Sequence, residues 1–343
     1  MAVTLKDVAR RAGVSVATAS RAFQRPEMLG EATLQTVRTA AEELGYVPNR
    51  TARALITGRS GVYGVIVPDL ENPFFPAVLK GAQARAQQLG AQLLITDAGE
   101  SPEGELPLVR TLAPQVDGIL LCSSRMDEDS LREAASLTPL SLVNRVSPDL
   151  PGVFADPEPG IPSALRHLRR MGHRRIGYVG GPRISRSDKV RRRVIARLCE
   201  ESGLEWIEIG AFAPTAEGGH DGAEAVLQTD ATAVLVYNDL MALALMERLR
   251  SYGIDVPGQV SLVGWDDIAF ATMAAPGLAT VQVPRYDMGV TGISLLHERV
   301  FGLSREPGRS ARIGLPTRFL PRGSIARVAG EETVPAGSGT LRA

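Results

Sequence analysis

Apolar residues follow two different patterns along this 343-residue chain, and the pattern changes near residue 60. Before that point apolar positions are three and four residues apart, which predicts amphipathic helices. After it, short apolar runs such as VYGVIVPDL at 62–70 and VDGILLCSS at 116–124 alternate with helical stretches. That alternation is typical of parallel sheets with crossover helices. The sequence therefore predicts a small helical unit followed by a larger α/β unit.

Residues 4–23 predict two short helices joined by a tight turn. Thr4 and Asp7 have the spacing of a capping box at the start of the first helix. Gly13 supplies the turn, and Ser15 can cap the second helix.

The second helix would bury Ala19 together with Ala22 or Phe23. Its outer face would then carry Val16, Ala17, Ser20 and Arg21. A helix-turn-helix of this kind places such a face in the major groove of DNA, although an ordinary helical hairpin has the same pattern.

The segment that follows makes the DNA-binding interpretation more specific. Residues 31–44 predict a third amphipathic helix, with Gly45 as its stop and Pro48 as the start of a fourth. The run TLKDVARRAGVSVATASR, with LGYVPNRTARAL after it, resembles the lactose-repressor (LacI/GalR) family of bacterial transcription regulators. The family pattern T-x-x-D-V-A-x-x-A-G-V-S-x-x-T-x-S-R is matched almost position by position.

The resemblance extends to about residue 325 through VPDLENPFF at 67–75, MGHRRIGYVGGP at 171–182 and VPGQVSLVGWDD at 256–267. It implies an all-α helix-turn-helix head joined by a hinge helix to a two-lobed α/β effector domain, whose parallel sheets are like those of periplasmic binding proteins. The expected boundaries are 1–46 for DNA binding, 47–60 for the hinge helix and linker, 61–327 for effector binding and dimerisation, and 328–343 for a disordered tail.

The residues predict a second α/β series beginning at Val153, and thus two lobes. The resemblance implies that the chain crosses between the lobes three times. Residues 284–308 should then return to the first lobe, and a strand near 313–320 should lie in the second.

On the DNA side, the resemblance implies a palindromic double-stranded operator bound by a homodimer. Val16 and Ala17 would face base edges, Arg21 a guanine or a phosphate, and Ser15 and Thr18 phosphates. In the hinge segment, Leu55 would be wedged into the minor groove, although it could also be a core leucine. The expected DNA-binding residues are Ser15, Val16, Ala17, Thr18, Ser20, Arg21, Asn49, Arg50, Ala52, Arg53 and Leu55.

For the small-molecule effector, the positions that match the family's ligand contacts are Asp69, Phe74, Asn144, Arg191, Phe212, Asn238 and Asp266. Carboxylates, amides and a guanidinium can hydrogen-bond adjacent hydroxyls, and a phenylalanine ring can cover the apolar face of a sugar. Each also has a structural interpretation: Asn238 could cap a helix, and the phenylalanines could be core residues.

Seven basic residues fall between Arg183 and Arg197, where the chain departs most from the family pattern. Arg186, Lys189, Arg193 and Arg197 recur at helical spacing, which favours one solvated face. The alternative is that they recruit an anionic effector such as a sugar phosphate or a sugar acid.

The charge distribution agrees with DNA contact by the N-terminal part. The net charge of the chain is zero, but residues 1–60 hold nine Lys or Arg against five Asp or Glu. The two cysteines, Cys122 and Cys199, form no metal-binding pattern, so we expect no metal or cofactor. With no secretion signal and no apolar run of membrane-spanning length, the expected location is the cytoplasm, away from the membrane.

Two other protein classes share the α/β pattern. An enzyme is disfavoured because G-x-G-x-x-G, G-x-x-x-x-G-K-[ST], G-x-S-x-G and H-x-x-x-H are absent from the sequence. A transporter's solute-binding protein would need a secretion signal in place of the helical head. We therefore expect a homodimeric repressor of sugar-utilisation genes, released by a small carbohydrate. A regulator corepressed by a purine-type ligand or a sugar phosphate remains the alternative.

Overall fold

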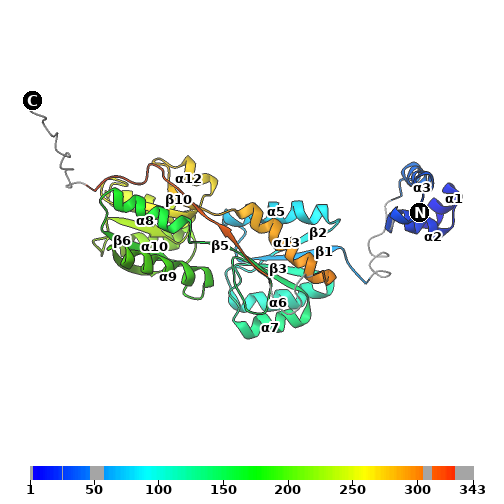
Figure 1. Ribbon diagram of the computed structural model, residues 1–343, viewed down its shortest axis with the longest axis horizontal. Helices are drawn as coiled ribbons and strands as arrows, with labels where there is room; N and C mark the ends of the chain where they lie inside the picture. The colour runs from blue at the N-terminus through cyan, green and yellow to red at the C-terminus, as the bar shows by residue number, and fades with distance from the viewer. Residues whose placement is uncertain (1–2, 25, 47–57, 304–310, 329–343) are drawn as a thin grey trace, which may run out of the picture. The chain divides into compact units, whose positions relative to one another are not determined.

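The computed structural model describes residues 3–24, 26–46, 58–303 and 311–328. The chain divides into two compact units, Met1–Gly61 and Val62–Ala343 (Figure 1). The hinge positions Asn49, Arg50, Ala52, Arg53 and Leu55, and most of the expected tail, lie outside the described residues. None of the described helices is both long enough and apolar enough to cross a membrane.

The N-terminal unit is a set of short helices with well-defined ends: α1 (Leu5–Ala12), α2 (Val16–Gln24), η1 (Pro26–Met28) and α3 (Glu31–Leu44). The backbone N–H of Thr4 donates to the Asp7 carboxylate at 3.0 Å at the start of α1. Gly13 ends α1 in the left-handed conformation, with φ of 66°. The hydroxyl of Ser15 then accepts from the Thr18 N–H at 3.0 Å, which caps α2 as the sequence predicts.

The core of this unit is made largely of small residues. Ala19 is fully buried and Ala22 nearly so, which confirms the predicted inner face of α2. The buried set is Val8, Ala9, Ala19, Ala22, Leu34, Val37, Ala40 and Ala41. Since alanines fill little space, the three helices can approach closely around Val8 and Val37.

The C-terminal unit contains two six-stranded sheets, which define its two lobes. The first-lobe sheet is entirely parallel and has the order β11-β5-β4-β3-β1-β2. Its strands are β1 (Val62–Val67), β2 (Gln92–Asp97), β3 (Gly118–Cys122), β4 (Leu140–Val143), β5 (Gly152–Asp156) and β11 (Arg312–Pro316).

The second-lobe sheet has the order β12-β10-β9-β8-β6-β7 and is parallel except for the β10–β12 pair. Its strands are β6 (Arg175–Gly180), β7 (Glu205–Ala211), β8 (Ala233–Val236), β9 (Ser261–Asp266), β10 (Ala279–Gln282) and β12 (Arg318–Leu320).

Helices cover both sheets (Figure 1). The first lobe carries α5 (Phe74–Gln88), α6 (Pro102–Leu112), η2 (Ala113–Gln115), α7 (Glu128–Leu137) and α13 (Arg285–Phe301). The second lobe carries α8 (Gly160–Arg170), α9 (Arg186–Glu201), α10 (Ala216–Val226), α11 (Asp239–Ser251) and α12 (Ala269–Met273).

The chain crosses between the lobes three times, after β5, after β10 and between β11 and β12. The Thr317 hydroxyl, between β11 and β12, donates to the Asp156 carbonyl at 2.7 Å, so the first and third crossing segments are bonded to each other. At the second crossing, the Arg285 guanidinium donates to the Asp267 carbonyl at 2.6 Å and to the Pro73 carbonyl at 3.3 Å.

Two details of the predicted topology are wrong. The strand near 313–320 is split, because residues 312–316 extend the first-lobe sheet next to β5 and only residues 318–320 pair in the second. Val153 likewise belongs to β5 of the first lobe, so the second lobe begins at α8. In both cases the chain forms a strand of the first-lobe sheet and only then crosses to the second lobe. Apolar periodicity cannot reveal which sheet a strand will join.

Two glycines allow α5 and α13 to lie side by side on the first lobe (Figure 1). A Cβ atom on Gly81 would be 1.9 Å from the Tyr286 carbonyl oxygen. One on Gly289 would be 2.0 Å from the Val78 carbonyl oxygen and 2.6 Å from the Ala82 nitrogen. Because these are backbone atoms, the helices would have to separate to admit any side chain.

We expect Gly289→Ala to lower the free energy of unfolding of the C-terminal unit by about 1–3 kcal/mol, the usual cost of overpacking. The control is Gly104→Ala in α6, where the nearest atom to an added Cβ is the Ser101 hydroxyl at 3.3 Å. Urea unfolding followed by circular dichroism measures both. An equal loss in the two variants would contradict the proposed packing role of Gly289.

Candidate functional site

The outer face of α2 is the exposed surface that the helix-turn-helix pattern predicts. Val16 is 44% exposed, and Ala17 and Arg21 are exposed beside it. Thr18 and Ser20 are half-buried. Apolar side chains at these positions can contact a thymine methyl group, and a guanidinium can donate two hydrogen bonds to guanine.

The charges of the N-terminal unit leave Arg21 available for an external partner. Arg11 pairs with Glu43 at 2.5 Å, and Arg10 lies 3.7 Å from Asp7. No ion pair joins Arg21 to any of the described residues. Its guanidinium can therefore bind a base or a phosphate without first breaking an intramolecular contact.

A second candidate site lies between the two lobes, at the carboxyl ends of their strands. The central cavity here is narrow in this structure, with a volume of about 30 Å³. Its walls include five of the seven expected effector residues, namely Phe74, Asn144, Arg191, Asn238 and Asp266. Residues beyond the carboxyl ends of parallel strands are where open α/β sheets bind ligands.

Two arginines in the lining of the central cavity are fixed by contacts with neighbouring residues. Arg191 is buried between the rings of Tyr237 and Trp265, with its guanidinium carbon 4.5 Å from each ring centroid, and it donates to the Tyr237 carbonyl at 2.6 Å. From the first lobe, Arg125 forms a two-pronged hydrogen bond with Glu100, at 3.1 and 3.0 Å. These planar, fixed donors give the cavity a defined shape before any ligand enters.

The amide side chains differ in how free they are to bind a ligand. Asn238 caps α11, since its oxygen accepts from the Met241 N–H at 2.7 Å and its nitrogen donates to the Pro214 carbonyl at 3.0 Å. The structural interpretation of Asn238 is thus confirmed. Among the described residues, Asn144 forms a side-chain hydrogen bond through its nitrogen alone, which donates to the Ser123 hydroxyl at 3.1 Å.

Asp266 is a buried carboxyl, only 5% exposed, at the end of β9. Burial raises its pKa well above the ordinary value, and the nearby charge of Asp239 adds to this, while Arg191 and Arg285 oppose it. Burial also raises the pKa of Asp239 to about 6, although its oxygens accept from the Thr280 hydroxyl at 2.6 Å and the Ile268 N–H at 2.9 Å.

The backbone around the central cavity is strained. Among the described residues, the non-glycine positions with positive φ are Glu100, Ser123, Asn144, Asp266 and Asp267. All five follow or end a strand whose carboxyl end faces the space between the lobes. Such conformations cost of order 1–3 kcal/mol each and concentrate at functional sites.

The remaining two expected effector residues do not line the central cavity. Asp69 is half-exposed, and its carboxylate accepts from the backbone N–H of Glu71 at 2.8 Å. Phe212 packs partly buried against the core of the second lobe. In contrast, Glu100, Arg125, Tyr237 and Trp265 line the cavity but are not predicted from the sequence. The one feature of the sequence that could have indicated these four residues is their position, because each lies at the end of an apolar run or just beyond it.

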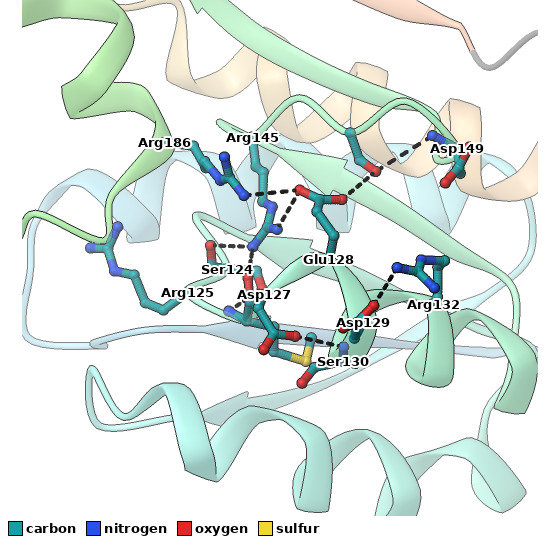
Figure 2. A network of polar contacts seen from close by, with 12 residues as sticks. Ser124, Arg125, Asp127, Glu128, Asp129, Ser130, Arg132, Arg145, Asp149 and Arg186 are labelled. Carbon is teal, nitrogen blue, oxygen red and sulfur yellow. Dashed lines mark hydrogen bonds and ion pairs between the residues drawn. The ribbon is translucent and has the colours of Figure 1, made fainter.

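One ion-pair network spans the two lobes beside the central cavity. Figure 2 shows the guanidinium groups of Arg145 and Arg186 side by side, both in contact with one oxygen of the Glu128 carboxylate at the start of α7. The nitrogen–oxygen distances are 3.1 Å to Arg145 and 3.3 Å to Arg186, which comes from α9 of the second lobe. Arg145 is 2% exposed, so Glu128 neutralises a buried charge and also joins the lobes.

Comparison with known proteins places both sites in one family. Residues 4–49 match the bacterial regulatory proteins of the lacI family, and residues 165–325 match the periplasmic binding protein-like domain. The HTH-type transcriptional repressor CytR of Escherichia coli (strain K12) is 32% identical over 333 residues, 94% of this chain and 96% of CytR. The chain belongs to the LacI family.

Solved structures agree with this family assignment. The lac repressor dimer bound to operator and the anti-inducer ONPF is 25% identical, with a TM-score of 0.82 over 95% of this chain and 100% of that one. The complex of the transcriptional regulator CelR with cellobiose is 29% identical, with a TM-score of 0.70 over 94% and 99% of the two chains. This LacI-family chain is a DNA-binding transcriptional regulator, not an enzyme.

Because the pKa of Asp266 is raised in the folded protein, the free energy of unfolding should fall as the pH rises. Since the folded regulator keeps the proton to higher pH than the unfolded chain does, Asp266 reduces stability increasingly as pH rises above about 4. We expect Asp266→Asn to gain stability over the wild type as the pH rises above about 4, by up to about 1.4 kcal/mol per pH unit until the folded-state pKa is passed. Calorimetric melting of both proteins, with Asp69→Asn as control, measures this difference. A difference that stays constant with pH would contradict the assigned cause.

Proposed function

We propose that this regulator is a homodimeric repressor of sugar-utilisation genes, which binds a palindromic operator and is released by a small carbohydrate bound between its lobes. The proposal of a carbohydrate effector rests on the central cavity, which is lined by Asn144, Arg191 and Asp266 together with the aromatic residues Phe74 and Trp265. Polar groups that exchange hydrogen bonds with hydroxyls, next to flat apolar faces, suit a sugar. The similarity to the CelR–cellobiose complex supports the same ligand class.

On the DNA, we propose that Val16 and Ala17 contact base edges in the major groove and that Arg21 contacts a guanine or a phosphate. The exposure of these three side chains on α2 supports that role. Ser15, Thr18 and Ser20 are suited to phosphates, although the Ser15 hydroxyl is also engaged in capping α2. In the hinge segment, Leu55 would enter the minor groove beside Asn49, Arg50, Ala52 and Arg53.

The three lobe crossings provide a route by which a ligand could act on the hinge segments. A carbohydrate that contacts Asn144 in the first lobe and Asp266 in the second would favour one arrangement of the lobes over another. In a dimer, that change would alter the spacing of the two hinge segments and so disfavour the insertion of Leu55. The ligand would thus weaken operator binding without touching the DNA.

We expect Arg21→Ala to weaken binding to an operator selected in vitro by about 1–3 kcal/mol, the usual contribution of a guanidinium that reads guanine. Fluorescence anisotropy with labelled duplexes measures operator and random DNA in parallel. The control, Arg38→Ala, removes the same charge from an exposed position on α3. If both variants lose the same affinity on both duplexes, Arg21 acts only through its charge.

We also expect Asp266→Ala to raise the carbohydrate concentration that halves operator occupancy by at least about tenfold, because a buried acceptor facing the ligand is lost. A carbohydrate panel added to the repressor–operator complex identifies the ligand and supplies the measurement. Asp69→Ala removes a carboxylate that does not line the cavity and is the control. Release by no member of the panel would contradict the carbohydrate effector and leave operator recognition intact.

A further inference from the structure

A wider groove between the lobes adjoins the central cavity and is strongly basic. Its volume is about 220 Å³, enough for a charged substituent of a small ligand. Five cationic side chains line this basic groove: Arg145 from the first lobe, and Arg186, Lys189, Arg191 and Arg193 from α9. No aspartate or glutamate is among the described residues that line it.

Neighbouring carboxylates neutralise only part of this charge. Glu128 pairs with both Arg145 and Arg186, so two guanidinium groups share a single carboxylate. Within the part of the chain that the structure describes, Lys189 and Arg193 have no ion pair. By contrast Arg197, one turn further along α9, pairs with Glu158 at 2.8 Å and with Glu201 at 3.0 Å.

This difference divides the basic run in two. Arg186, Lys189 and Arg193 are exposed, as a solvated face requires, but they are exposed toward the basic groove. Arg197 is exposed elsewhere and is paired. The predicted solvated face is thus confirmed by exposure, while three of its four members line the basic groove.

Arg145 forms a fixed part of the wall of the basic groove. It is only 2% exposed, and its Nε has no hydrogen-bond partner among the described residues. A buried guanidinium with an unused donor is costly unless an acceptor is supplied. Figure 2 shows the other two nitrogens of Arg145 bonded to Glu128 and to the loop at Ser124, so the side chain is held in place.

The central cavity has a different charge balance from the basic groove. Glu100 and Asp266 line it together with Arg125 and Arg191, so its acidic and basic side chains are equal in number. Asn144, Arg191 and Trp265 line both spaces, so the two compartments adjoin at these side chains. A ligand with its hydroxylated body in the cavity would place a substituent in the basic groove.

We propose that the effector is a carbohydrate bearing an anionic group, a phosphate or a carboxylate, and that Lys189 and Arg193 bind this group together with Arg186. The inference rests on the proposed carbohydrate effector and specifies its chemical class. The anion would also compete with Glu128 for Arg186, and would therefore replace a contact between the lobes. The charge of the ligand would then act directly on the Glu128–Arg186 ion pair that joins the lobes.

Isothermal titration calorimetry on the full chain at constant ionic strength tests the proposal. The probes are glucose, glucose 6-phosphate, glucuronic acid and inorganic phosphate. The groove variant is Lys189→Gln with Arg193→Gln. Its matched control, Arg166→Gln with Arg197→Gln, removes two exposed cations from α8 and α9 that do not line the groove.

We expect inorganic phosphate to bind the wild type and the control equally, and the groove variant at least about tenfold more weakly. At least one anionic sugar should bind more tightly than glucose, and that preference should be lost in the groove variant. Phosphate binding that is absent, or equally weakened in both double variants, would overturn the proposal. Tighter binding of the phosphate than the uronate would identify the anion as a phosphate.

The anisotropy assay on the operator separates this proposal from the proposed function. Release by a neutral sugar, with no preference for an anionic one in any assay, would overturn the anionic class and keep the carbohydrate effector. Alternatively, inorganic phosphate could bind in a way that depends on the groove residues while no carbohydrate releases the protein from its operator. That result would support the anion site and contradict the carbohydrate effector.

Discussion

The parallel pairing of strands is the constraint on which the rest of the C-terminal unit depends. Parallel strands all end at one edge of a sheet, so the loops after β2, β3, β4 and β9 gather between the lobes. Polar residues at those ends must then satisfy one another, as Arg125 does with Glu100 and Asn144 with Ser123. The strained backbone at these positions is the local cost of that convergence.

Sequence patterns predicted the parts of the structure that depend on local chemistry. Ser15, Gly13 and Gly45 act at helix ends through their own side chain or backbone, so their roles are visible in isolation. The boundary between β11 and β12 was not predictable, because it depends on which sheet offers a free edge. Arg125 and Glu100 were missed for a similar reason: they are 25 residues apart and meet only through the fold. Asn238 has both roles at once, since a helix cap can also line a cavity.

The charges between the lobes are arranged in two compartments with different chemical demands. In the central cavity Arg125 is paired with Glu100 and aromatic rings lie nearby, which favours recognition of shape and hydroxyl groups over net charge. The basic groove concentrates positive charge around one shared carboxylate, Glu128. Low-dielectric walls strengthen electrostatic interactions in such a space, so a small change in ligand charge can alter binding substantially.

The threefold crossing of the chain has a consequence for its synthesis. Residues 62–156 of the first lobe are made early, but α13 and β11 are not complete until residue 316 has been added. Until α13 has been made, the face of β3, β4 and β5 that it covers lacks this helix. The strands of the second lobe, by contrast, run almost without interruption from β6 to β10. Only β12 of that lobe is added after β11. On the ribosome, the lobe that is encoded first therefore has the longer interval between its first strands and its last elements.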